Sequence, residues 1–278
     1  MVAVEAEINY IRNPPAPGAG PLEYVTEAEE RNTMVTLPGR LMTITNARLL
    51  DTDLDREGFV LAQHVSAVAD FHRIQEDPAV DQQYIDETTA FLTQLVGASR
   101  VTMLGGGKKR YGEPATDRLA SLKNAKPARY PHTDNTEASA VELAQLFDMF
   151  VDDLDLGSYG RYAMYNIWRT FTPPPQDFPL AVCDARSMAP TDEVTVTAIS
   201  GELSGEVVHD TASYVHNPAH RWYYFPDMTI DEVIVFKSYD SDPTRTSRVA
   251  HTAFTDPTCP PGVPTRASVE MRALALFD

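Results

Sequence analysis

The sequence predicts an α+β fold in which a β-rich core of the sandwich or barrel type follows a helical first part. From Tyr159 onward, short runs rich in Val, Ile, Tyr, Phe and Trp alternate with Pro, Gly, Asn and Asp, the pattern of many short strands joined by turns. The first part instead shows apolar residues at helical spacing. The predicted strands are 161–171, 180–184, 193–199, 206–208, 221–225, 232–237, 248–254 and 267–277.

The first half supplies the expected helices and an N-terminal arm. Residues 1–40 are rich in Pro, Gly and Glu and predict an extended arm. Helices are expected at 58–71 and 77–96, where apolar side chains recur every three or four positions, and at 136–154, where Thr136 is a candidate N-cap. Shorter signals predict strands at 41–48 and 101–104 and a glycine-rich loop at 104–109. We expect one domain over 1–278, made of the arm, a mainly helical part over 41–126 and the core over 127–278.

Composition excludes several classes of function. The formal net charge is -17, which disfavours nucleic acids and anionic membrane surfaces as partners because both attract Lys and Arg. No apolar run approaches the roughly 20 residues that span a bilayer, and residues 1–10 do not resemble a signal peptide. The two cysteines show no CxxC spacing, which disfavours a thiolate zinc site. We therefore expect a soluble cytoplasmic protein that binds a small molecule.

The metal-binding signal is the segment His132-Thr133-Asp134. Residues two apart on an extended chain point the same way, so this imidazole and this carboxylate can reach one ion. His251 lies in an apolar, β-prone segment and is the best candidate for a third ligand; the alternative is a histidine without a metal. Two His and one carboxylate on one face of an ion are typical of non-haem Fe(II) oxygenases.

Arg266 and Ser268 predict where a cosubstrate would bind. They open the last predicted strand, fifteen residues after His251, and share one side of it. A guanidinium binds a carboxylate through two hydrogen bonds, and a hydroxyl two residues on adds a donor. This suits the distal carboxylate of 2-oxoglutarate, whose other end would bind the iron. The alternative for Arg266 is a solvated charge at a strand end.

The order HxD, then His, then RxS resembles that of the Fe(II)/2-oxoglutarate-dependent oxygenases. A closer resemblance is to the CmcJ-like hydroxylase/desaturase family, which includes the cephamycin 7α-methoxylase component and gibberellin-desaturase-like proteins. The segments that carry it are NIWR at 166–169, PLAVCDARS at 179–187, HRWYYFPDM at 220–228, DEVIVFKSYDS at 231–241 and HTAF at 251–254.

The resemblance implies a double-stranded β-helix, or jelly roll, with the N-terminal helices packed on it. His132 and His251 are 119 positions apart, so the helix at 136–154 and the Pro-rich loop at 172–179 would form an insertion between core strands. It also implies Fe(II), 2-oxoglutarate and O₂ as reactants and a small natural product as substrate. The sharpest expectation is a cephalosporin hydroxylated at C7 with a methyltransferase as partner. Desaturation or another oxidative tailoring reaction is the alternative.

Two further residues are candidates for contact with cosubstrate or substrate. Asn166 and Arg169 lie on one predicted strand, where Asn166 shares a face with Trp168 and Arg169 points the other way. The alternative is a core tryptophan with polar neighbours. Two other classes of function remain open: a non-catalytic jelly-roll subunit that binds a methyltransferase, and a zinc- or iron-dependent cupin-type hydrolase or isomerase, which would not need Arg266.

Overall fold

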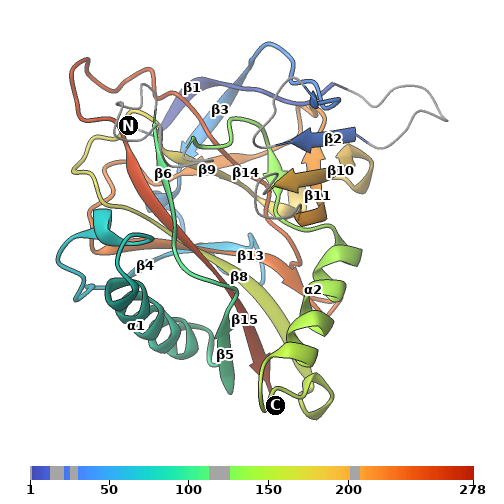
Figure 1. The fold of residues 1–278 in the computed structure, drawn as a ribbon. Coiled ribbons are helices and arrows are strands. Elements are labelled where there is room, and N and C mark those ends of the chain that lie inside the picture. Colours follow the sequence, from blue (N-terminus) through green and yellow to red (C-terminus); the bar gives the residue numbers. More distant parts are fainter. Residues whose placement is uncertain (1, 13–21, 26–30, 113–125, 201–206) are drawn as a thin grey trace.

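The computed structural model describes residues 2–12, 22–25, 31–112, 126–200 and 207–278, and these form two large β-sheets with two α-helices (Figure 1). Almost all neighbouring strands are antiparallel; β2 with β10 and β3 with β12 are the parallel pairs of the described chain. The nine-stranded sheet contains, in spatial order, β1 (Ala3–Ile8), β3 (Arg40–Asn46), β12 (Trp222–Tyr224), β9 (Leu180–Cys183), β14 (His251–Ala253), β7 (His132–Thr133), β11 (Val207–Tyr214), β10 (Glu193–Ser200) and β2 (Leu22–Val25). The six-stranded sheet contains β4 (Phe59–Gln63), β13 (Glu232–Asp240), β8 (Arg161–Thr170), β15 (Ala267–Phe277) and β5 (Arg100–Met103), with β6 (Lys108–Tyr111) also paired to β15.

The two faces of the six-stranded sheet bury different kinds of residue. On β15, Val269, Met271 and Ala273 belong to an apolar core on the outer face. The alternate residues of the same strand, Glu270 and Arg272, line a cavity toward the nine-stranded sheet. This alternation follows from the two-residue period of a strand. On β15 it directs the polar residues into the space between the sheets and the apolar residues into the outer core.

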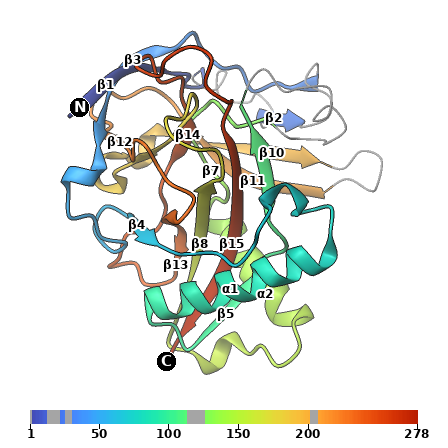
Figure 2. The ribbon, with the colours of Figure 1, turned by 90° about the vertical axis from the view of Figure 1, so that its left-hand side faces the viewer.

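Helix α1 (Pro78–Val96) covers the outer face of the six-stranded sheet (Figure 2). Asp77 caps its first turn and Gly97, with φ of 66°, ends it in the left-handed region. Tyr84 and Leu92 are fully buried in the core formed with β8, β13 and β15. The helix predicted at 77–96 is confirmed.

Helix α2 (Glu137–Phe150) starts directly after the metal-binding segment. The Thr136 hydroxyl accepts from the Ser139 amide, and the Ser139 hydroxyl accepts in return from the Thr136 amide. Ala140 and Ala144 are fully buried under β8, β13 and β15 residues. The helix begins where predicted and ends four residues earlier, and its cap fixes how the chain leaves the site.

The helix predicted at 58–71 is wrong. Residues 59–63 form β4, which pairs with β13 from Phe59↔Phe236 to Gln63↔Glu232. A short apolar run does not distinguish a helix from a buried strand, and here β13 offers backbone hydrogen bonds that a local helix would forgo. The part over 41–126 is accordingly not mainly helical: its described residues hold strands β3 to β6 and a single α-helix.

The N-terminal arm is also more regular than predicted. Within 1–40, β1 pairs with β3 along its whole length at the edge of the nine-stranded sheet, and β2 pairs with β10. The predicted loop at 104–109 is shorter, because β6 begins at Lys108. The strands expected from residue 161 onward are all found, with β11 and β13 longer than predicted. No helix in the described part of the chain combines the length and hydropathy needed to cross a membrane.

His220 anchors the N-terminal end of the fold. Its Nε2 contacts Asp192 Oδ2 at 3.1 Å and its Nδ1 contacts the Tyr10 hydroxyl at 3.0 Å. Burial lowers the pKa of His220, although Asp192 opposes this. Below about pH 6.5 the unfolded chain therefore binds a proton at this histidine more tightly than the folded chain does. Protonation thus favours unfolding, and His220 lowers the stability of the protein as the pH falls below about 6.5.

Replacing His220 by asparagine should weaken this acid sensitivity. We expect the urea midpoint of the wild-type protein to drop more between about pH 7.5 and pH 5 than that of His220→Asn. Parallel denaturation curves at the two pH values test this. Equal drops in both proteins would show that His220 does not contribute.

Candidate active site

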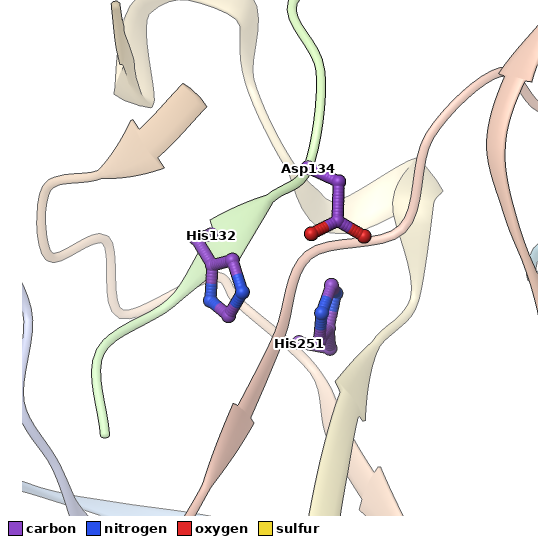
Figure 3. A group of neighbouring side chains, drawn as sticks. All are labelled: His132, Asp134 and His251. Atoms are coloured by element: carbon purple, nitrogen blue, oxygen red, sulfur yellow. The ribbon is translucent and has the colours of Figure 1, made fainter. Parts of the chain in front are cut away.

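Three side chains predicted to bind a metal converge between the sheets. His132 lies on β7 and His251 on the adjacent β14, and the two residues are direct partners across the strands. Asp134 follows two residues after His132, on the same side of the extended chain. One ligand atom from each of the three lies within 4.8 Å of the others, and the side chains point toward one another (Figure 3). The predicted convergence is confirmed.

Backbone carbonyls fix which nitrogen of each histidine faces the centre. His132 Nδ1 lies 3.0 Å from the Tyr130 carbonyl oxygen, and His251 Nδ1 lies 3.3 Å from that of Val249. Nδ1–H donates in both cases, which leaves Nε2 as the metal-facing lone pair. Burial, followed by the charge of His251, lowers the pKa of His132 to about 3. The His132 imidazole is therefore neutral, as a metal ligand must be.

Asp134 is held as an anion by two donors. Its Oδ1 accepts from Arg272 Nη2, and its Oδ2 accepts from Asn166 Nδ2 at 2.5 Å. Burial raises the pKa of Asp134, but the charge of Arg272, aided by the hydrogen bond from Asn166, helps to hold the pKa below its usual range. A carboxylate with both oxygens oriented in this way offers a fixed direction to an ion.

Glu270 closes this arrangement into a ring. Its Oε1 accepts from Asn166 Nδ2 at 3.3 Å and from Arg272 Nε at 3.1 Å, so Asn166 and Arg272 each bridge Glu270 and Asp134. Sequence reasoning missed Arg272 and Glu270. The signal was present: they continue the two-residue period of Arg266 and Ser268 along one face of β15.

Arg272→Gln should weaken metal binding without removing a ligand. Losing an outer partner of a metal ligand typically lowers metal affinity about 10- to 100-fold. We expect a loss of that size for Fe(II), measured by anaerobic titration. Arg100→Gln on the neighbouring strand β5 is the matched control, since among the described residues Arg100 donates to the carbonyls of Asp152 and Asp153 and not to the site. Unchanged affinity in Arg272→Gln would remove Arg272 from the site.

A cavity joins the two histidines to the polar face of the six-stranded sheet. Its volume is about 80 Å³. Both sheets line it, and the contributing residues are Lys108, Arg110, Pro127, Ala128, His132, Trp168, Leu180, His251, Thr252, Ala253, Arg266, Glu270 and Arg272. This places a cationic, partly apolar cavity directly beside the candidate metal ligands.

Arg266 is a buried guanidinium without an anionic partner in the described chain. It is 1% exposed, its Nε has no hydrogen-bond partner, and its guanidinium carbon lies 5.5 Å from the centre of the Trp168 ring. Its backbone amide, not its side chain, binds Asp177. Burial lowers the pKa of the guanidinium to about 10. A buried charge left in this way is costly and fits a carboxylate ligand such as 2-oxoglutarate.

The other predicted cosubstrate residues lie in different places. Ser268 is buried behind the lining, where its hydroxyl contacts the Arg110 carbonyl oxygen at 3.4 Å. Asn166 contacts Asp134, which makes it a neighbour of the metal ligands.

Arg169 does not lie in the cavity, and the prediction that it binds the cosubstrate is corrected. Its guanidinium binds the Ile230 carbonyl oxygen at 2.9 Å and His64 Nδ1, and it lies over the rings of Phe71 and Tyr84. Adjacent strand residues face opposite sides, and β8 has no bulge there to turn Arg169 inward.

Comparison with known proteins agrees with this geometry. The family model described as "Oxidoreductase/YMDC permease-like domain" matches residues 8–276. The Fe(II)/2-oxoglutarate-dependent dioxygenase nvfI of Aspergillus novofumigatus is 30% identical over 226 residues, which are 80% of this chain and 77% of that protein. The hydroxylase/desaturase efuI of Hormonema carpetanum is 28% identical over 296 residues, covering 99% of this chain and 95% of that protein.

A solved structure extends the likeness to the fold. The iron and alpha-ketoglutarate-dependent endoperoxidase NvfI superimposes with a TM-score of 0.83 at 25% identity, over 99% of this chain and 98% of that chain. The likeness covers both sheets, and His132, Asp134 and His251 supply the two imidazoles and one carboxylate expected of an iron centre. The chain therefore belongs to this oxidoreductase family and is an iron- and 2-oxoglutarate-dependent dioxygenase of the hydroxylase/desaturase type.

Proposed function

We propose that this chain oxidises a C–H bond of a small natural product, by hydroxylation or by desaturation. His132, Asp134 and His251 would hold Fe(II), and Arg266 would hold the distal carboxylate of 2-oxoglutarate. The observation that carries the proposal is that the Arg266 guanidinium is buried, forms no ion pair within the described chain, and lines the same cavity as both histidines. When bound, iron with 2-oxoglutarate and O₂ supplies the oxidising power for an unactivated C–H bond.

The protein's own contribution is to orient the ligands and to exclude water. The ring formed by Asp134, Asn166, Glu270 and Arg272 keeps the carboxylate ligand in one direction, and the two backbone carbonyls keep both Nε2 atoms inward. Arg266 would set the angle at which the cosubstrate enters. Trp168 and Leu180 line the same cavity and limit access of water.

The architecture of the core belongs to the same proposal. We infer that the facing sheets form a double-stranded β-helix, because His132 and His251 lie on adjacent strands of one sheet, Asp134 directly follows the first of these, and Arg266 directly precedes β15 of the other sheet. We further infer a single domain over 1–278. Strands from both halves of the chain are neighbours in each sheet: β1 and β3 share one with β12, and β4 shares the other with β13.

The wider class of substrate is better supported than a cephalosporin. The relatives reported above are fungal proteins described as a dioxygenase, a hydroxylase/desaturase and an endoperoxidase. None of these descriptions names a cephem or a methyltransferase. We therefore propose oxidative tailoring in secondary metabolism.

The test is turnover of the cosubstrate. The protein is loaded with Fe(II) and 2-oxoglutarate without oxygen and then exposed to O₂, and succinate is measured with and without candidate substrates. We expect succinate from the wild-type protein and almost none from Asp134→Ala. Activity that persists without 2-oxoglutarate would point instead to a cupin-type hydrolase or isomerase.

A further inference from the structure

The cavity holds more positive charge than iron and 2-oxoglutarate require. Its lining includes Lys108, Arg110, Arg266 and Arg272, but Glu270 is the acid among the described lining residues. The chain as a whole carries a formal charge of -17, so this local excess of cations opposes the general composition. A cavity of one charge sign concentrates ligands of the opposite sign.

Two of the four cations are already accounted for. Arg272 forms ion pairs with Asp134 and with Glu270. Arg266 is assigned above to 2-oxoglutarate. With both ligands bound, the charge of Fe(II) would cancel that of the 2-oxoglutarate dianion, and the charges of Arg272 and Arg266 would cancel those of Asp134 and Glu270. The positive charges of Lys108 and Arg110 would then remain uncompensated.

Lys108 and Arg110 are placed to act together. They are alternate residues of β6 and therefore face the same side of the strand. Lys108 is the partner of Glu270 in the strand pairing and Arg110 is the partner of Ser268, so both side chains extend over the face of β15 that carries Arg266 and Arg272. Lys109, between them, points the other way and pairs with Glu76.

Neither side chain forms an ion pair within the described chain, although Glu270 and Asp134 lie near enough to attract both charges. Within the described chain, the Arg110 side chain donates from Nη1 to the Lys109 carbonyl oxygen at 3.2 Å, and Lys108 forms no ion pair with a described acid. The charge of Arg272 and then burial lower the pKa of Lys108, and burial lowers that of Arg110. The charged forms of both side chains are therefore unfavourable in the free protein, and a bound anion would offset this cost.

We propose that the substrate is a carboxylate-bearing small molecule whose anionic group is held by Lys108 and Arg110. This deepens the proposed function and rests on it. A guanidinium and an ammonium side by side suit a carboxylate, because each can donate to a different oxygen. The rest of the lining includes Trp168, Leu180 and Ala253, so the substrate body is apolar and the charged group lies at one end.

The experiment uses protein that cannot turn over. Mn(II) replaces iron, and saturating N-oxalylglycine fills the cosubstrate position, so a second acid cannot bind there. The probes are 4-fluorobenzoate and its methyl ester, which differ in charge and little in shape. Broadening of the fluorine signal by Mn(II) reports binding close to the metal.

We expect broadening for the acid and little for the ester. Arg110→Gln and Lys108→Gln should each weaken binding of the acid by roughly tenfold or more, the loss typical of a charge-assisted hydrogen bond. Binding of N-oxalylglycine should stay unchanged in both variants. Arg100→Gln, a cation of the same sheet outside the cavity, is the matched control.

Two failures are distinguishable. In the first, N-oxalylglycine binds, but the fluorine signal of the acid is not broadened, or is broadened as much with the Arg110 and Lys108 variants as with the wild-type protein. The inference of an anionic substrate is then wrong, and the proposed function stands. If N-oxalylglycine does not bind the wild-type protein at all, the proposed function itself is rejected, and this inference with it.

Discussion

Replacing His251 by alanine should abolish 2-oxoglutarate turnover. His251 is 4% exposed and supplies one of the three ligand atoms that lie within 4.8 Å of one another. Removing a ligand costs more than the roughly 10- to 100-fold loss of metal affinity seen when an outer partner is removed. We expect Fe(II) affinity to fall by at least that range and succinate formation to reach background, as measured by anaerobic titration and by product analysis.

The control for this prediction is His216→Ala. His216 is exposed, contacts the ring of Tyr10 and is not one of the three grouped ligand residues, so its loss should leave both readouts near wild type. The same pair of variants tests the alternative of a non-catalytic subunit. A protein that supports its biological reaction equally well with and without His251, while remaining folded by circular dichroism, would be a scaffold.

Arg266→Met should produce two opposite effects. Affinity for 2-oxoglutarate should fall by roughly 30-fold or more, because truncating one member of a buried charge pair costs about 2–5 kcal/mol. The protein without ligands should become no less stable, and more stable if Met fills the space, because a buried charge without an anion in the described chain is removed. The measurements are a titration with N-oxalylglycine and thermal melts with and without it.

Arg169→Met is the matched control for Arg266. Arg169 is equally buried but binds the Ile230 carbonyl oxygen and His64 on the other face of β8. Its replacement should lower stability and leave affinity for N-oxalylglycine unchanged. If Arg266→Met instead destabilised the free protein and kept its ligand affinity, Arg266 would be a structural residue and the cosubstrate would bind elsewhere.

The convergence of the candidate metal ligands was predictable because their signals are local. His132 and Asp134 are two positions apart, so strand geometry alone puts them on one side. His251 is set in an apolar, β-prone segment where a polar side chain needs a partner, and Arg266 opens the last predicted strand with Ser268 on the same side. α1 was predictable for the same reason, since Asp77, Pro78 and Gly97 mark its ends in the sequence.

Contacts between distant segments were not predictable in this way. β4 was mistaken for a helix because its pairing with β13, about 170 positions away, decides its conformation. Glu270 and Arg272 join the site because the folded sheets bring β15 next to Asp134 and Asn166. The inward position of Lys108 and Arg110 likewise depends on the register between β6 and β15.

The sequence by itself determined the chemical types proposed for the site: two imidazoles and a carboxylate as candidate metal ligands, and a guanidinium as the candidate partner of a dianionic cosubstrate. The tertiary structure alone decided which of the other polar residues share the cavity. It excluded Arg169 and brought in Arg272, Glu270, Lys108 and Arg110. The physical reason is that a strand assigns side chains to faces locally, whereas the pairing of strands far apart in the chain decides what each face meets.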